Sequence, residues 1–317
     1  MKNPYILLLV KATIFVVSFV LLDFLIGFFF DKISNRAFEK NEFARELSHR
    51  YCIEVDTSDV VIFGASTANH HYITNQIADS LHTSVYNHGA DGCFFLFNNT
   101  LMNIMLDRHQ PKVIIWEIGE SYLSSYYDVN KEYQNMHLLY PWYKSPYVKK
   151  MVDKQDCFQK YRMLSNAYKN NSKLLMYFRL CTGDFNQHMG GYLPIATDYT
   201  LNDNYYDDTQ LLYSNHKIVQ EKVIILEQTI NRCKELGVKL VMVSSPRYYS
   251  DYVKSRDYYI KLREIAFQND IPFLDFYNAE PFNKEPTWFR ERTHMNHIGA
   301  EEYMKVFIPA LKEVLTQ

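Results

Sequence analysis

The sequence predicts an α/β fold with a mainly parallel sheet covered by helices on both faces. It also predicts one N-terminal transmembrane helix and an aromatic-rich helical insertion. Three observations support this prediction. From residue 59 onward, short apolar segments alternate with amphipathic segments of helical length, the pattern of a parallel sheet. An apolar run lies near the N-terminus, and between residues 121 and 215 the alternation stops.

The apolar run covers residues 12–30 and contains one charged residue, Asp23. Nineteen helical residues span roughly 28 Å, about the hydrocarbon thickness of a bilayer. A polar segment follows instead of a small-residue cleavage site, which favours an uncleaved anchor over a removed signal peptide. The alternative is a buried core helix, but a soluble helix of this length normally has a polar face. We therefore predict a membrane anchor at residues 1–31 and a juxtamembrane linker at 32–58.

The remaining residues, 59–317, are predicted to form one α/β domain. Its expected elements, in chain order, are a strand at 60–64, a helix at 75–81, a strand at 84–87, a helix at 94–107, a strand at 112–118, a helical stretch from 218 to a stop at Gly237, a strand at 239–244, a helix at 257–268, a strand at 272–276 and a helix at 299–315. Parallel strands end at a common edge of the sheet, where ligands bind in such folds.

The predicted insertion covers about residues 121–215 and holds fifteen of the chain's 26 tyrosines. A segment this long is not typical of a plain loop, so we expect a helical insertion or cap. Aromatic faces in a cap could stack on the sugar rings of a polysaccharide. Packing within the insertion, or a subunit contact, is the alternative role for these tyrosines.

Composition argues against several classes of function. A net charge of −2 provides no basic field, which argues against a nucleic-acid partner. The five cysteines show no CxxC spacing, which argues against a zinc knuckle or a redox pair. His70, His71 and His88 have no carboxylate or cysteine at a familiar metal-ligand spacing. We therefore expect neither a metal nor a cofactor.

Two short motifs, more than two hundred residues apart, indicate chemistry. Gly64-Ala65-Ser66 follows a predicted buried strand and places a serine where a helix begins, whereas Glu291 precedes His294 by three residues just before the last helix. A hydroxyl nucleophile needs a base, and the base needs a third group to orient it. Ser66, His294 and Glu291 are therefore our candidate catalytic residues. The alternatives are a helix-capping serine, a solvated loop histidine and a surface ion pair of Glu291 with its arginine neighbours.

These motifs resemble those of the SGNH (GDSL-like) hydrolase superfamily, especially its membrane-anchored bacterial branch linked to envelope or exopolysaccharide acyl groups. Gly64-Ala65-Ser66 resembles the nucleophile block, Asn87-His88-Gly89 the second block, and residues 291–299 the Asp-x-x-His-x-Asn-x-x-Gly block. The resemblance implies a flavodoxin-like three-layer sandwich. It also implies that the Ser66 and Gly89 amides receive the oxyanion.

The sequence departs from this family at two positions. Glu291 stands where the family has an aspartate, so a backbone carbonyl is an alternative orienting group for His294. In the third block, at Gly119-Glu120-Ser121-Tyr122, Ser121 stands where the family's asparagine donor belongs. Loss of one oxyanion donor typically costs about 10²–10³ in rate. Asn87 or Ser121 is therefore an alternative donor.

The resemblance implies a serine esterase or O-acyltransferase that forms an acyl-serine intermediate. The expected substrate is an acylated carbohydrate, carrying O-acetyl groups of a cell-envelope or secreted polysaccharide, and envelope polysaccharide machinery is the expected partner. A catalytically inactive protein that binds polysaccharide or assists envelope assembly is the alternative. Basic residues flanking the anchor favour a cytoplasmic domain. The envelope chemistry of the family favours the opposite side, and we predict an extracytoplasmic domain.

Overall fold

The computed structural model describes residues 4–119, 121–125, 129–170, 173–186, 189–196, 216–248 and 256–316. The chain divides into two compact units. Unit 1 comprises Met1–Leu47 and His137–Asn186, and unit 2 comprises Ser48–Met136 and Gln187–Gln317.

Unit 2 contains a five-stranded sheet in which every pair of neighbouring strands is parallel. The strands are β1 (Val60–Phe63), β2 (Val85–Asn87), β3 (Val113–Glu117), β4 (Lys239–Ser244) and β5 (Phe273–Asp275). Their order in the sheet is β2-β1-β3-β4-β5, which is the flavodoxin-like order. The predicted α/β class, with its parallel sheet, is therefore confirmed.

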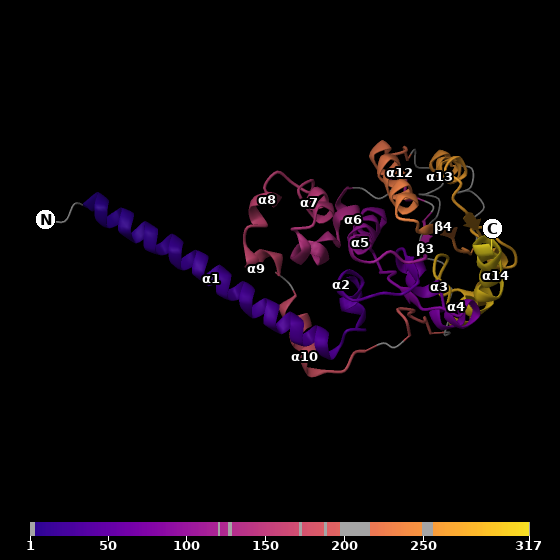
Figure 1. Cartoon of the computed structure of the whole chain (residues 1–317), viewed down its shortest axis with the longest axis horizontal. Helices are drawn as coiled ribbons and strands as arrows, with labels where there is room; N and C mark the ends of the chain where they lie inside the picture. Colours follow the sequence, from indigo (N-terminus) through magenta and orange to yellow (C-terminus); the bar gives the residue numbers. More distant parts are fainter. Residues whose placement is uncertain are drawn as a thin grey trace. The chain divides into compact units, whose positions relative to one another are not determined.

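Helices cover both faces of this sheet (Figure 1). On one face, Val60 and Ile62 of β1 share a core with residues of α3, α4 and α14, such as Phe307. Side chains alternate along a strand, so Trp116 of β3 points to the other face and stacks on Phe95 of α5 at 5.5 Å. The helices of unit 2 are α2 (Ser48–Glu54), α3 (Ser66–His71), α4 (Thr74–Leu81), α5 (Phe95–Arg108), α6 (Val129–Tyr133), α12 (Gln220–Glu235), α13 (Asp257–Gln268) and α14 (His297–Thr316), with 3-10 turns η4 (Phe282–Lys284) and η5 (Pro286–Trp288).

Unit 1 is built on one long helix, α1 (Pro4–Lys40). It is the one helix in the described part of the chain that is long and apolar enough to cross a membrane. The most apolar 18-residue stretch of this helix is not buried by the rest of the protein. The helix continues past residue 31 because Phe30 and Ala37 pack with Tyr177 and Leu180 in a small core. The other elements are η1 (Arg45–Leu47), η2 (Met136–Trp142, which crosses the unit boundary), α7 (Pro146–Val152), α8 (Gln159–Arg162), α9 (Asn166–Lys169) and α10 (Leu174–Thr182).

The predicted insertion is helical where it contributes to unit 1, and much of its C-terminal part lies outside the described residues. Several of its tyrosines are packed. Tyr140 stacks on Tyr168 at 5.9 Å, and Tyr177 and Tyr192 are buried. For these four residues, packing is the role that the contacts favour over sugar stacking.

Candidate active site

The turn after β1 brings Ser66 to the start of α3. Gly64 makes this turn possible, because a Cβ there would lie 2.6 Å from the Cβ of Ala68 and 2.8 Å from that of Glu117. The absence of a side chain lets α3 begin directly beside β3. As the first residue of the helix, Ser66 has an N–H group with no carbonyl one turn earlier within the helix to accept it.

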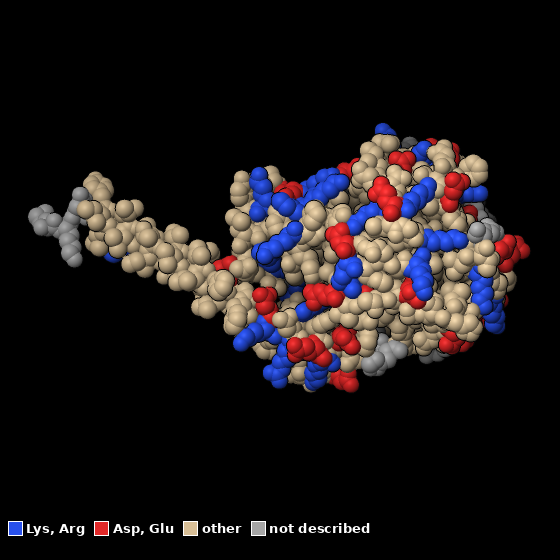
Figure 2. Space-filling view, in the orientation of Figure 1, with Lys and Arg blue, Asp and Glu red and all other residues tan. Residues whose placement is uncertain are grey.

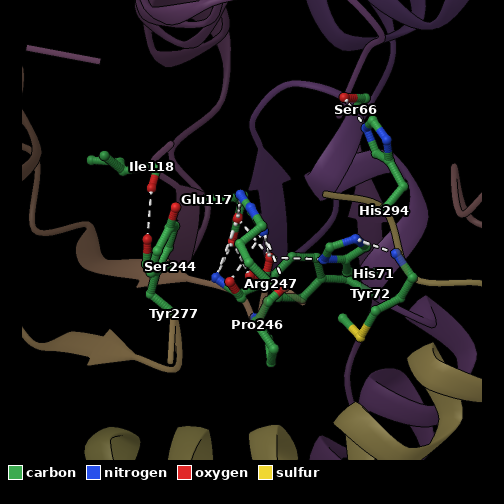
Figure 3. A network of polar contacts seen from close by, with 12 residues as sticks. Ser66, His71, Tyr72, Glu117, Ile118, Ser244, Pro246, Arg247, Tyr277 and His294 are labelled. Atoms are coloured by element: carbon green, nitrogen blue, oxygen red, sulfur yellow. Dashed lines mark hydrogen bonds and ion pairs between the residues drawn. The ribbon is translucent and has the colours of Figure 1, made fainter. Parts of the chain in front are cut away.

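His294 lies beside Ser66 although 228 residues separate them. Its Nε2 is 2.5 Å from Ser66 Oγ (Figure 3). Its Nδ1 contacts a carboxylate oxygen of Glu291. A carboxylate can only accept, so Nδ1 carries the proton and Nε2 is left to accept the Ser66 hydroxyl hydrogen. The contacts are those of a nucleophile, a base and an orienting acid.

Glu291 is held in place by the backbone of its own loop. Its carboxylate accepts the N–H groups of Thr293 at 3.0 Å and His294 at 2.9 Å. Burial raises its pKa, but the contacts with His294 and these two amides outweigh burial and lower the pKa below its ordinary value. The longer glutamate side chain therefore reaches Nδ1, and the carboxylate occupies the place that a backbone carbonyl would have needed.

The residues after His294 anchor the loop to the last helix. Asn296 is buried, accepts the Gly299 N–H at 2.9 Å at the start of α14, and donates to the Thr287 carbonyl at 2.7 Å. A Cβ at Gly299 would lie 2.1 Å from the carbonyl oxygen of Trp288. These contacts give a structural reason for the Asn and Gly of the C-terminal motif.

The predicted oxyanion donor Gly89 has an intramolecular partner. Its N–H donates to Asn87 Oδ1 at 2.8 Å, and Asn87 Nδ2 donates to the Ala68 carbonyl at 2.7 Å. The Asn87 side chain therefore joins the end of β2 to α3. The Gly89 N–H already has an acceptor, and an oxyanion role for Gly89 or Asn87 stays a prediction.

The third block is described at Gly119, Ser121 and Tyr122. Ser121 is buried in the turn after β3, where its carbonyl accepts from the N–H and hydroxyl of Ser124, and Glu120 lies outside the described residues. An oxyanion role for Ser121 stays a prediction.

His88 has a structural environment. Its Nε2 lies 2.8 Å from Asp56 Oδ2 and its Nδ1 3.2 Å from Ser48 Oγ, and both His88 and Asp56 are buried. Although burial raises the pKa of Asp56, His88 and Ser58 lower it to about 2. His70 donates through Nδ1 to the Leu193 carbonyl at 2.7 Å, with its ring 5.6 Å from that of His294. The described residues include no cluster of three or more metal-ligating side chains.

A buried polar network connects to the backbone next to His294, and sequence reasoning missed it. The Met295 N–H donates to His71 Nε2 at 3.0 Å, so His71 Nδ1 carries the proton and donates to Ser245 Oγ at 2.8 Å. Ser245 Oγ donates to Glu117 Oε1 at 2.7 Å, and Arg247 lies 3.5 Å from the same carboxylate (Figure 3). The network therefore fixes the peptide that follows His294.

Glu117 is the charged centre of this network. It is fully buried at the end of β3, where burial raises its pKa while Arg247, the Tyr72 hydroxyl and Ser245 oppose the rise. One signal in the sequence could have revealed it, namely a carboxylate among the apolar residues 113–118 of the predicted strand 112–118. A buried charge needs partners, but their identity cannot be read from the strand.

His71 is expected to make unit 2 sensitive to acid. Burial, followed by the nearby Arg247, holds the pKa of His71 well below its ordinary value of 6.5. In the unfolded chain this side chain binds a proton near pH 6.5, whereas in the folded chain it stays neutral. The unfolded state thus binds more protons as the pH falls below about 6.5, and stability should fall by up to about 1.4 kcal/mol per pH unit.

The measurement is urea unfolding of the wild type and His71→Gln at about pH 7 and about pH 5. Glutamine can keep one donor and one acceptor but does not titrate, so part of the pH dependence should disappear. Equal pH dependence in the two proteins would show that His71 is protonated without cost.

Comparison with known proteins gives no match to a protein-family model or to a curated protein. Among solved structures, the chain is similar to a GDSL-like lipase from Bacteroides thetaiotaomicron VPI-5482, with 12% identity, a TM-score of 0.37, and coverage of 84% of this chain and 99% of that one. It is also similar to an acetyl xylan esterase, with 11% identity, a TM-score of 0.38, and coverage of 79% and 98%. At these values, neither structure assigns a role to a residue of this chain. In the order of its motifs and the strand order of its sheet, the chain resembles the SGNH (GDSL-like) hydrolase superfamily.

Proposed function

We propose that the chain is a serine esterase or O-acyltransferase that acts on acyl esters through an acyl-serine intermediate. The observation that carries this proposal is the 2.5 Å approach of Ser66 Oγ to His294 Nε2, with Glu291 on the opposite ring nitrogen. A capping serine or a solvated histidine would not require this three-part contact.

The chemistry begins when Ser66 Oγ attacks the ester carbonyl carbon and His294 Nε2 takes the hydroxyl proton. Glu291 stabilises the resulting imidazolium through Nδ1–H. Collapse of the tetrahedral intermediate breaks the bond to the alcohol oxygen, which leaves with the proton from Nε2. Water then resolves the acyl-serine in an esterase, and a sugar hydroxyl resolves it in a transferase.

The Ser66 amide is the proposed oxyanion donor, because it lies at the start of α3. Gly89 can serve as a second donor only if its N–H leaves Asn87 Oδ1. Each missing donor typically costs about 10²–10³ in turnover, so a slow hydrolase or a transferase is expected.

The proposed substrate is an O-acetylated polysaccharide of the cell envelope or a secreted glycan, in line with the family that the motifs resemble. Ser66 is half-buried, and the side chains of His294 and Glu291 are 26% and 22% exposed, so the triad is accessible from solvent. We further propose that α1 anchors the protein and that the catalytic domain is extracytoplasmic, near envelope polysaccharide machinery. Large domains translocate largely regardless of their own charge.

The experiment is labelling of the full detergent-solubilised chain with a fluorophosphonate probe, followed by mass spectrometry of the labelled peptide. We expect the label on Ser66 and slow release of acetate from an acetylated xylan or an activated acetyl ester. His294→Gln should prevent both, because the hydroxyl then has no base. Labelling of another serine would assign the chemistry elsewhere.

Replacement of Glu291 measures the contribution of the acid. Glu291→Gln removes the charge that stabilises the imidazolium, and we expect kcat to fall by about 10²–10⁴, less than for loss of the nucleophile. Glu280→Gln, an exposed residue before the same loop, should leave kcat unchanged. An effect near zero for Glu291→Gln would mean that another group orients His294.

One observation favours the alternative of an inactive polysaccharide-binding protein, namely the Gly89 amide that donates to Asn87. If the chain hydrolyses neither the activated acetyl ester nor the acetylated xylan, and the fluorophosphonate probe does not react, this alternative gains support. Retention of the chain on an acetylated polysaccharide column, without acetate release, would then identify it.

A further inference from the structure

The single acid of the apolar run in α1 is bound by a segment distant in sequence. Asp23 accepts hydrogen bonds from Ser165 Oγ at 2.6 Å, Asn166 N at 2.8 Å and Ala167 N at 3.0 Å. One turn later, a Cβ at Gly27 would lie 2.6 Å from the Cβ of Asn166. Within unit 1, α9 therefore lies directly against the apolar part of α1.

α10 continues this contact along α1. The rings of Phe29 and Phe178 lie 6.4 Å apart, and Phe30 and Ala37 share a core with Tyr177. Just past the end of α1, the side-chain amide of Asn41 donates to the carbonyl of Gly183 at 3.2 Å. Residues 165–170 and 173–183 thus follow the chain from Asp23 of α1 to Asn41.

The depth of these contacts follows from the length of the helix. Lys11 carries the charge at one end of the apolar run, and from there to Asp23 the helix rises about 18 Å, well short of a hydrocarbon core of about 30 Å. Residues 24–30 must therefore also lie at membrane depth. On one side these residues are covered by α9 and α10 rather than by lipid.

The segment that lies at this depth has an apolar and basic surface. Leu164 is 77% exposed and Leu175 82% exposed, and Phe158, Tyr161 and Phe178 are exposed as well. Residues 137–186 also carry a net charge of +6 in a chain of net charge −2, from nine basic residues (Lys144, Lys149, Lys150, Lys154, Lys160, Arg162, Lys169, Lys173 and Arg179) and three acids (Asp153, Asp156 and Asp184). Of the nine basic residues, Lys173 is buried, so it is the other eight that contribute to the surface. On the face seen in Figure 2, Lys and Arg side chains gather over α7 and α8.

We propose that residues 158–170 and 173–178 of unit 1, here called the interfacial platform, lie at the boundary between the acyl chains and the headgroups of the bilayer that α1 crosses. The exposed leucines and aromatic rings enter the acyl boundary, and the basic residues of unit 1 bind anionic lipid headgroups. Apolar side chains flanked by lysine and arginine are the composition of interfacial membrane helices. The Asp23 contacts satisfy a carboxylate that would otherwise be unpaired at membrane depth.

The proposal rests on the proposed role of α1 as a membrane anchor, and the test distinguishes failure of the platform from failure of the anchor. Full-length chains are reconstituted into phosphatidylcholine vesicles with and without phosphatidylglycerol, each with an environment-sensitive fluorophore on one introduced cysteine. The background is Cys157→Ser with Cys181→Ser, and the three remaining cysteines are buried. The labelled sites are Leu175→Cys on the platform, Val17→Cys in α1, and Asp184→Cys. Asp184 is exposed and follows Gly183, which contacts Asn41. Asn41 lies eleven residues after Phe30, a rise of about 16 Å at helical spacing.

Nitroxide-labelled lipids should quench the Leu175 probe to nearly the same extent as the Val17 probe, and leave the Asp184 probe bright. Quenching at Leu175 should be stronger in vesicles with phosphatidylglycerol. Quenching at Val17 but not at Leu175 would refute the platform and keep the anchor, whereas no quenching at Val17 would refute both. A Leu175 probe shielded from lipid nitroxides and from aqueous acrylamide would instead indicate a covering protein surface, and equal quenching in both lipid mixtures would refute the anionic preference.

Discussion

Ser66→Ala is expected to lower ester turnover by about 10⁴–10⁶ and to abolish labelling by a fluorophosphonate, while the fold stays intact. The physical reason is that Ser66 Oγ is the group within 2.5 Å of His294 Nε2, and alanine leaves that base with no proton to remove. The stability change should be small, because the hydroxyl is half-buried and its loss opens no sizeable cavity. Turnover is measured on the purified full chain, and folding by circular dichroism and thermal unfolding.

The matched control is Ser80→Ala in α4, which removes a hydroxyl of similar exposure away from His294. It should leave both turnover and labelling unchanged. Residual turnover of the Ser66 variant at the wild-type level would show that the hydrolysis comes from another site.

Glu117→Ala is expected to cost about 3–5 kcal/mol of unfolding free energy, the largest effect on stability that we predict. It removes the acceptor for Tyr72 and Ser245 and leaves the Arg247 guanidinium buried without this carboxylate. Because the network reaches Met295 through His71, turnover should also fall in whatever fraction remains folded. Urea unfolding gives the change in free energy. The effect on activity is the turnover divided by the number of active sites, which is counted by fluorophosphonate titration of Ser66.

The double variant Glu117→Met with Arg247→Met separates charge burial from packing. If the pair is coupled, removing both charges should cost clearly less than the sum of the two single changes. Additive costs would mean that Glu117 and Arg247 act independently, and that the carboxylate is stabilised by its neutral donors alone.

The local patterns of the sequence were sufficient for much of the fold. Apolar runs of strand length, separated by helical periods, are short-range features, so the sheet and its parallel class could be read directly. The motif that ends β1 placed Ser66 at a helix start, and the three-residue spacing of Glu291 and His294 lets one loop hold both side chains. In these cases, the interacting groups lie within one turn or one loop of each other.

Other features depended on residues that are far apart in the chain. Glu117 meets Ser245 and Arg247 across about 130 positions, and Asp23 meets Ser165 across 142. No periodicity links such pairs, because their distance is set by how the strands and helices pack. The Asn87 side chain shows the same limit, since the motif predicts where the asparagine lies but the packing of β2 against α3 decides that its amide donates to the Ala68 carbonyl.

The sequence by itself thus determined the identity of the triad candidates, the apolar helix and the alternating α/β order, because each motif or element is encoded in one continuous stretch of the chain. The tertiary structure alone decided which acceptor each buried donor has, which carboxylate neutralises which cation, and which side of α1 is covered by protein. The physical reason is that buried polar groups must be satisfied by whatever group packing brings within about 3 Å, and that group can lie anywhere in the chain.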